Sequence, residues 1–273
     1  MLSTFLIALR EGLEASLIVS ILIAYLSRTG RASFARYIWI GVGGAVLLSF
    51  GLGALLSFTS ASLSTRGEAL FAGLTSVLAV SFVTVMVFWM KRTARGLGRE
   101  LQSRVDDALP LGGFALISAS FFAVAREGLE TSLFIYSNFK AVGSHAGPTL
   151  GLIVGLATSV TLGALIYRKT VKLNLGKFFT VTGYGLIIVA GGVLSHAVAE
   201  FQSRGDLPGA TSLIWNQQNG NGFLWTIIDG SVGIGAQMSY LQLTTWAIYL
   251  AVVISIYRRP AKLSELAPLS KVQ

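Results

Sequence analysis

A five-residue cluster of charge occurs twice in this sequence, each time inside a long apolar stretch. The first copy, Arg-Glu-Gly-Leu-Glu at residues 10–14, lies between MLSTFLIAL and ASLIVSILIAYL, and residues 126–130 repeat it exactly in type and order. In a helix, residues three and four apart share one face. The two glutamates of each copy therefore project side by side, and the arginine lies within reach of the second glutamate. Carboxylates grouped in this way are hard oxygen ligands for a metal cation.

Two copies brought together would place four carboxylates and two guanidiniums at one site. The candidate metal ligands are Glu11, Glu14, Glu127 and Glu130, and the supporting cations are Arg10 and Arg126. Ionisable groups within membrane segments usually face the bundle interior and mark routes for ions or substrates. The structural alternative is an ion pair that only holds two helices together. Such a pair needs one glutamate, and it leaves the second one on the same face unexplained in both copies.

The composition is that of a polytopic membrane protein. Of 273 residues, 53% are hydrophobic and 12% are charged, about half the charged share of a soluble domain. Runs long enough to cross a bilayer predict seven transmembrane helices in an all-α chain, at residues 2–26, 38–58, 69–90, 111–137, 148–168, 178–200 and 239–257. The chain has no cysteine, which excludes disulfides and thiolate metal sites. The N-terminal run lacks the pattern of a cleaved signal peptide, so we expect it to be a mature helix.

The net charge of +9 indicates an orientation in the membrane and not a nucleic-acid surface. Four connections or tails carry most of the cations: Arg28, Arg31 and Arg36; Lys91, Arg92, Arg95, Arg99 and Arg104; Arg168, Lys169, Lys172 and Lys177; Arg258, Arg259, Lys262 and Lys271. The alternate connections hold only Arg66, Lys140 and Arg204. Because positive charge accumulates in cytoplasmic loops, the N-terminus is predicted outside and the C-terminus in the cytoplasm.

The repeated motif also predicts an internal repeat. REGLEASL at 10–17 and REGLETSL at 126–133 agree at seven of eight positions, and each opens a group of three predicted helices. Since three is odd, the second group crosses with opposite polarity, as in transporters built from inverted repeats around a central site. One domain, 1–273, is thus divided into repeat one (about 1–92), repeat two (about 110–200), an outer loop (201–238) and a seventh span.

A paired Arg-Glu-x-x-Glu motif in the first and fourth of seven spans resembles the oxidase-dependent iron transporters, the fungal high-affinity iron permeases and their bacterial EfeU-type relatives. The resemblance extends to the FWMKR run at 88–92 and to a tryptophan-bearing outer segment before the last span. It implies a permease, not an enzyme, that moves Fe³⁺ through the cytoplasmic (inner) membrane into the cell. The four glutamates would bind iron, with both arginines as essential companions.

The same resemblance implies partners and cargo. Iron is the transported substrate and no bound organic cofactor is expected. The chain has few histidines and no cysteine, so iron oxidation would fall to a separate oxidase or peroxidase, with a periplasmic iron-delivery protein in bacteria. Membrane lipid surrounds the chain, and no nucleic acid is involved.

Four further residues are candidates for a secondary metal relay: Glu68, His196, Glu200 and Asp229. The family often carries a glutamate in a Phe-Glu-Gly run where this chain has Phe71-Ala72-Gly73, and Glu68 stands one turn away. His196 and Glu200 share a helix face at the outer end of the sixth span, where the alternative is contact with headgroups or water. Asp229, within WTIIDGS, falls near an acidic loop motif of the family.

Three alternatives remain open from the sequence. The same architecture can carry another metal such as lead(II), because carboxylates discriminate weakly among hard cations and lead permeases share the motif. A structural membrane scaffold would use the motif only as ion pairs. An intramembrane glutamate protease would need a histidine to activate water, and the chain has only His145 and His196.

Overall fold

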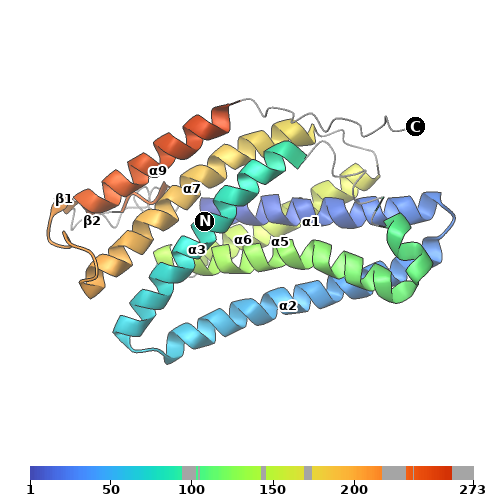
Figure 1. Ribbon diagram of the computed structural model, residues 1–273, viewed down its shortest axis with the longest axis horizontal. Helices are drawn as coiled ribbons and strands as arrows, with labels where there is room; N and C mark the ends of the chain where they lie inside the picture. Colours follow the sequence, from blue (N-terminus) through green and yellow to red (C-terminus); the bar gives the residue numbers. More distant parts are fainter. Residues whose placement is uncertain are drawn as a thin grey trace, which may run out of the picture.

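The computed structural model describes residues 1–93, 103, 105–142, 146–168, 174–216, 232–235 and 237–259. Each of the seven predicted spans corresponds to one long helix in these residues (Figure 1). The helices are α1 (Leu2–Arg28), α2 (Ala35–Ser62), α3 (Thr65–Thr93), α5 (Gly113–Val142), α6 (Ala146–Tyr167), α7 (Leu175–Arg204) and α9 (Tyr240–Arg258), with short 3₁₀ turns η1 (Ala32–Phe34) before α2 and η2 (Leu109–Leu111) before α5.

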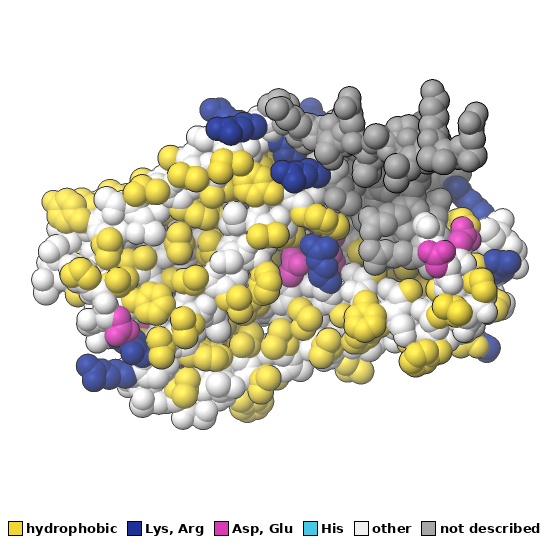
Figure 2. All heavy atoms as spheres, in the orientation of Figure 1, with side chains coloured by type: hydrophobic (Ala, Val, Ile, Leu, Met, Phe, Trp, Pro, Cys, Tyr) yellow, Lys and Arg dark blue, Asp and Glu magenta, His cyan; other side chains and the backbone are white. Residues whose placement is uncertain are grey.

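The outer surface of the helices is that of a multi-pass membrane protein. Within the described residues, five segments are long and apolar enough to cross a bilayer: Ala32–Ser62, Thr65–Arg92, Ala146–Tyr167, Gly176–Arg204 and Tyr240–Arg258. α1 and α5, with 27 and 30 residues, are as long, but each carries the charged motif. Large apolar side chains such as Phe50 and Phe58 are exposed, and Figure 2 shows hydrophobic groups spread over the face in view, with few charged side chains among them. A bilayer removes this surface from water.

The described chain is almost entirely helical, as the all-α prediction requires, and two short strands lie between α7 and α9. β1 (Leu213–Asn216) pairs antiparallel with β2 (Gln237–Ser239). The bulky apolar and aromatic residues of β1 favour an extended backbone. Ser239, the last residue of β2, caps α9: its hydroxyl accepts a hydrogen bond from the backbone N–H of Gln242, whose side chain accepts one from the Ser239 N–H. This capping box fixes where the last long helix begins.

Helices from the two halves of the chain pack in pairs. The most extensive contacts join α1 to α6, α2 to α5 and α3 to α7, and α9 packs against α7. Small residues on α6, at four-residue spacing, let α1 approach closely. A Cβ added at Gly155 would lie 2.7 Å from the carbonyl oxygen of Phe5 and 2.8 Å from Cβ of Ala8. The Gly147-Gly151-Gly155 spacing is therefore a packing feature and has no contact with the motif carboxylates.

The α1–α6 contact gives a stability prediction. We expect Gly155→Val to destabilise the protein by roughly 1–3 kcal/mol or more, because the added atoms meet the α1 backbone, which has little room to move. The measurement is the midpoint of thermal unfolding of the purified protein in detergent. Gly43→Val is the matched control, since a Cβ there meets nothing within 4 Å. Equal midpoints for the two variants would show that the close approach is not needed.

Candidate metal site

The two charged motifs meet where α1 contacts α5. Glu11, Glu14 and Glu127 are buried, and each offers a carboxylate oxygen within 4.8 Å of the other two. Oxygen ligands of a small, hard, octahedral cation lie about 3–4 Å apart. Small rotations of these side chains would therefore close the three oxygens around one ion. The predicted convergence of glutamates from both motifs is present in the structure.

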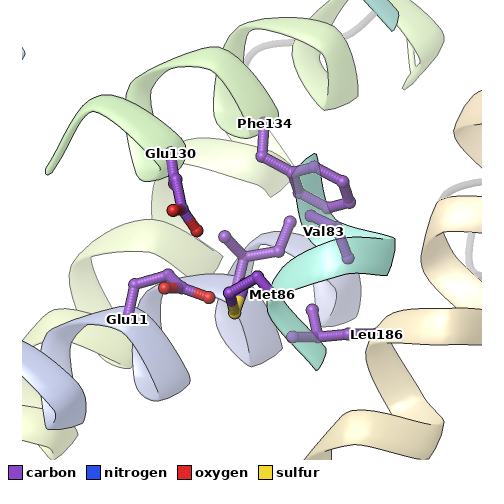
Figure 3. A pocket seen from close by; sticks show the side chains of 7 residues that line it. Glu11, Val83, Met86, Glu130, Phe134 and Leu186 are labelled. Atoms are coloured by element: carbon purple, nitrogen blue, oxygen red, sulfur yellow. The ribbon is translucent and has the colours of Figure 1, made fainter. Parts of the chain in front are cut away.

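The fourth motif glutamate lies across a small cavity from the first. Figure 3 shows the carboxylates of Glu11, on α1, and Glu130, on α5, pointing toward one another. The rest of the lining is apolar: Ile7 from α1, Val83 and Met86 from α3, Phe134 from α5 and Leu186 from α7. Two carboxylates thus face one another in a cavity whose other lining side chains are apolar.

Both arginines form the predicted ion pair with the glutamate four residues on, but in different surroundings. Arg10 Nε lies 3.2 Å from Glu14 Oε1, its Nη1 lies 3.4 Å from Glu11 Oε1, and its side chain is 1% exposed. Arg126 Nε lies 3.1 Å from Glu130 Oε1, yet its side chain is 41% exposed. The Arg126 guanidinium also lies 4.2 Å from the ring centre of Trp89 on α3, a cation–π contact.

The carboxylates retain unused capacity for a ligand. Oε2 of Glu11, of Glu127 and of Glu130 is buried without a hydrogen-bond partner. A buried acceptor that lacks a partner costs free energy, and a buried unpaired charge costs more. A cation bound where Glu11, Glu14 and Glu127 converge would supply a partner for Glu11 and Glu127, so this donor set fits a metal ion.

The glycine within each motif allows a second helix to approach. A Cβ at Gly12 would collide with the side chain of Ser159 on α6, and one at Gly128 would collide with the side chain of Ser49 on α2. The structure places a helix serine against the glycine in both motifs.

The secondary candidates lie away from the carboxylate cluster. Glu68 accepts a hydrogen bond of 2.6 Å from Lys140 Nζ and is eighteen residues from Met86, about 27 Å along α3. His196 Nε2 lies 3.2 Å from Glu200 Oε1, ten residues from the cavity residue Leu186, or about 15 Å along α7. Asp229 lies outside the described residues, as do His145 and Trp225.

Sequence reasoning missed the apolar and aromatic neighbours of the motifs. Ile7 stands four residues before Glu11 and Phe134 four residues after Glu130. Residues four apart share a helix face, so this spacing could have indicated that each lies beside a motif glutamate. Trp89 belongs to the FWMKR run, to which the sequence assigned no role. The neighbours of Trp89 in that run anchor α9: Lys91 Nζ donates to the carbonyl oxygens of Tyr257 and Arg259.

Comparisons with known proteins show similarity along nearly the whole chain. The chain matches the "Iron permease FTR1 family" over residues 1–261. It is 37% identical to "Ferrous iron permease EfeU" of Shigella sonnei (strain Ss046) and to the protein of that name from Escherichia coli O157:H7, over 94% of this chain and 95% of each relative. The Yersinia pestis protein of that name is 34% identical, over 94% and 93%. No solved structure matches.

Proposed function

The chain belongs to the iron permease FTR1 family, and from that premise we propose that it moves Fe³⁺ through the cytoplasmic membrane into the cell, with the paired motifs as the binding site. One observation carries the proposal: three buried carboxylates, contributed by both motifs, lie within 4.8 Å of one another in a helical membrane protein. Iron is the cargo. The relatives and the family are permeases, which supports transport and not catalysis.

The choice of Fe³⁺ rests on the donor atoms. The relatives are named for ferrous iron, whereas the described cluster consists of carboxylates. Fe²⁺ sites commonly include imidazole, while oxygen-only donors suit harder cations. A separate oxidase or peroxidase would form Fe³⁺ outside, and a periplasmic protein would deliver it. Four carboxylates against two guanidiniums leave an excess of negative charge for a highly charged ion.

The topology we propose has seven spans, two inverted repeats of three helices, and α9 outside the repeat. Its support is the packing of the first helix of each half against the second helix of the other, and of the two third helices together. That pattern is expected of halves related by a twofold axis in the membrane plane. The basic connections then lie in the cytoplasm, with the N-terminus outside.

In the proposed mechanism each arginine pairs with its glutamate whenever no ion is bound. An arriving ion would lose water to the carboxylates and displace Arg10 from Glu14, and Arg126 from Glu130. Inward movement of a trivalent cation is favoured by the membrane potential, by roughly 7 kcal/mol at 100 mV. The arginines then re-form their pairs when the ion leaves, which limits the cost of burying empty carboxylates.

We assign Glu68, His196, Glu200 and Asp229 to an outer relay that precedes the central site. For the described pair, His196→Gln and Glu200→Gln should raise the iron concentration that gives half-maximal uptake several-fold while leaving the maximal rate unchanged. A relay delivers iron to the carboxylates but takes no part in the later steps. Its loss therefore changes the half-saturating iron concentration and not the maximal rate. The measurement is the initial rate of uptake against iron concentration. A fall in the maximal rate with no change in half-saturation would remove these residues from the relay.

The proposed cargo is tested with purified protein in liposomes and radiolabelled iron. Vesicles are offered Fe³⁺ as its citrate complex or Fe²⁺ kept reduced with ascorbate, each with and without excess lead(II), manganese or zinc. We expect Fe³⁺ accumulation that lead does not suppress. Accumulation of Fe²⁺ alone would assign the chain to ferrous iron, and strong suppression by lead would favour the lead permease alternative. No transport of any of these metals, with folded protein in the vesicles, would favour a scaffold.

The protease alternative is disfavoured by the position of the described histidine. A histidine that activates water must lie within hydrogen-bond reach of the reacting group. His196 pairs instead with Glu200, about 15 Å along α7 from the residue that lines the cavity.

A further inference from the structure

The two motifs share five identical residues, but their arginines meet different surroundings. The Arg10 side chain is 1% exposed and the Arg126 side chain 41% exposed. A guanidinium at the middle of a span is costly in hydrocarbon and usually faces a water-filled cavity or the protein interior. The exposed part of Arg126 therefore indicates water that reaches the second motif, or another protein surface that covers it.

On the side of the N-terminus, the carboxylates are closed off by layers in which α1 faces α5. Glu11 of α1 and Glu130 of α5 form one layer across the cavity. Ile7, four residues before Glu11, and Phe134, four residues after Glu130, form the next layer toward the N-terminus. Their exposed fractions are 1% and 2%. The next layer is polar. There Ser3 Oγ donates to Asn138 Oδ1 at 3.0 Å, in a buried contact.

The apolar layer is a barrier to an ion. Val83 of α3 completes it and is 4% exposed. None of these three side chains can replace the water of a cation, and Figure 3 shows Phe134 and Val83 beside the space between the glutamates. An ion that approached from the N-terminal side could pass only if these side chains separated.

In the opposite direction along α5, the motif ends at Arg126, which is partly exposed and contacts Trp89 of α3. Arg126 precedes Glu127 in the chain and lies on the side away from Phe134. Its guanidinium is held over the Trp89 ring at 4.2 Å while Nε contacts Glu130 at 3.1 Å. Trp89 thus keeps the arginine beside the carboxylates and at the surface at once.

We propose that ions leave the carboxylates past Arg126 and Trp89, and that the layer of Ile7, Val83 and Phe134 is the gate that is closed on the N-terminal side. The inference rests on the proposed transport function and deepens it: ions enter the site from the N-terminal side and leave it on the side of Arg126. Trp89 is a positioning residue: it holds Arg126 where it can pair with a glutamate as soon as the ion departs. In this proposal the described structure is closed on the N-terminal side, and the partly exposed Arg126 marks the side on which ions leave.

The exit route can be tested by cysteine labelling, because the chain contains no cysteine. Arg126→Cys and Trp89→Cys are each prepared in membrane vesicles of both orientations and treated with a charged, membrane-impermeant methanethiosulfonate. We expect rapid reaction only when the reagent is on the side opposite the N-terminus. Phe50→Cys is the control, an exposed position on the apolar surface that lipid shields from the reagent.

Two results would overturn the exit route. Reaction from the N-terminal side alone would show that Arg126 and Trp89 face the outside, so ions could not leave past them into the cell. Reaction from neither side faster than in Phe50→Cys would mean that lipid or a second protein surface covers Arg126. Labelling needs no iron, so a chain that carries another cation would still give the expected pattern. Loss of iron transport with intact labelling would count against the proposed cargo alone.

The proposed gate is tested by adding a second substitution to the Trp89→Cys protein. Phe134→Ala should admit the reagent from the N-terminal side as well, whereas Phe122→Ala, which removes an exposed aromatic ring of α5, should not. Ile7→Ala shortens the same layer from α1 and serves if Phe134→Ala does not accumulate in the membrane. One-sided labelling in both gate variants would show that this layer is not the barrier.

Discussion

Replacing Glu11 or Glu127 by glutamine should reduce iron uptake at least tenfold, with both proteins present in the membrane at normal abundance. Each change keeps the size of the side chain but removes one of three buried carboxylates that lie within 4.8 Å of one another. Loss of partners that merely orient a metal ligand typically costs 10–100-fold in affinity or activity, so loss of a ligand itself should cost at least as much. The measurement is radiolabelled iron uptake in iron-starved cells that lack other importers.

The stability of the same variants separates metal binding from a purely structural role. If the glutamates bind iron, Glu127→Gln should unfold at the same or a higher temperature than the parent, because it removes one of several like charges buried together. Asp206→Asn, at an exposed ion pair with Arg204, is the matched control and should leave uptake unchanged. Normal uptake by both Glu11→Gln and Glu127→Gln would remove the chemical basis of the proposed site.

The positions of the helices and the meeting of the motifs were accessible from the sequence. Apolar runs of bilayer length fix the helices, and a motif repeated in the first and fourth of them must face inward because lipid does not tolerate four carboxylates. The i, i+4 pairs of Arg10 with Glu14 and of Arg126 with Glu130 follow from helix geometry alone. All of these are local consequences of residue type and spacing.

What the sequence could not provide is the relative placement of helices. Identical motifs predict identical environments, yet Arg10 is enclosed while Arg126 lies on Trp89. Trp89 lies on α3, 37 positions before Arg126 in the sequence, and no local pattern encodes the approach of α3 to α5. Nor does the sequence show that Ile7 would face Phe134, since this register depends on how α1 and α5 slide past one another.

The environments of the two arginines give the second large effect, on stability. We expect Arg10→Met to destabilise the protein by roughly 3–5 kcal/mol, because the change leaves buried carboxylates without their cation. Arg126→Met should cost about 1 kcal/mol or less, since its ion pair and its contact with Trp89 are partly exposed and screened by solvent. Identical motifs would then respond unequally to identical substitutions. The measurement is the midpoint of thermal unfolding in detergent without added metal.

A double variant shows whether the effect of Arg10→Met arises from the uncompensated carboxylate. Adding Glu14→Gln removes the charge that Arg10 neutralises at 3.2 Å, and well-packed neutral groups often replace a buried ion pair without loss of stability. The double variant should therefore recover much of the lost stability while it remains inactive in iron uptake, because a proposed ligand is gone. Equal destabilisation by Arg10→Met and Arg126→Met, or no recovery in the double variant, would mean that the stability of α1 does not depend on this charge pair. Recovery of folding without recovery of transport would separate the two roles of the motif: its arginine compensates buried charge, and its glutamates are kept for the ion.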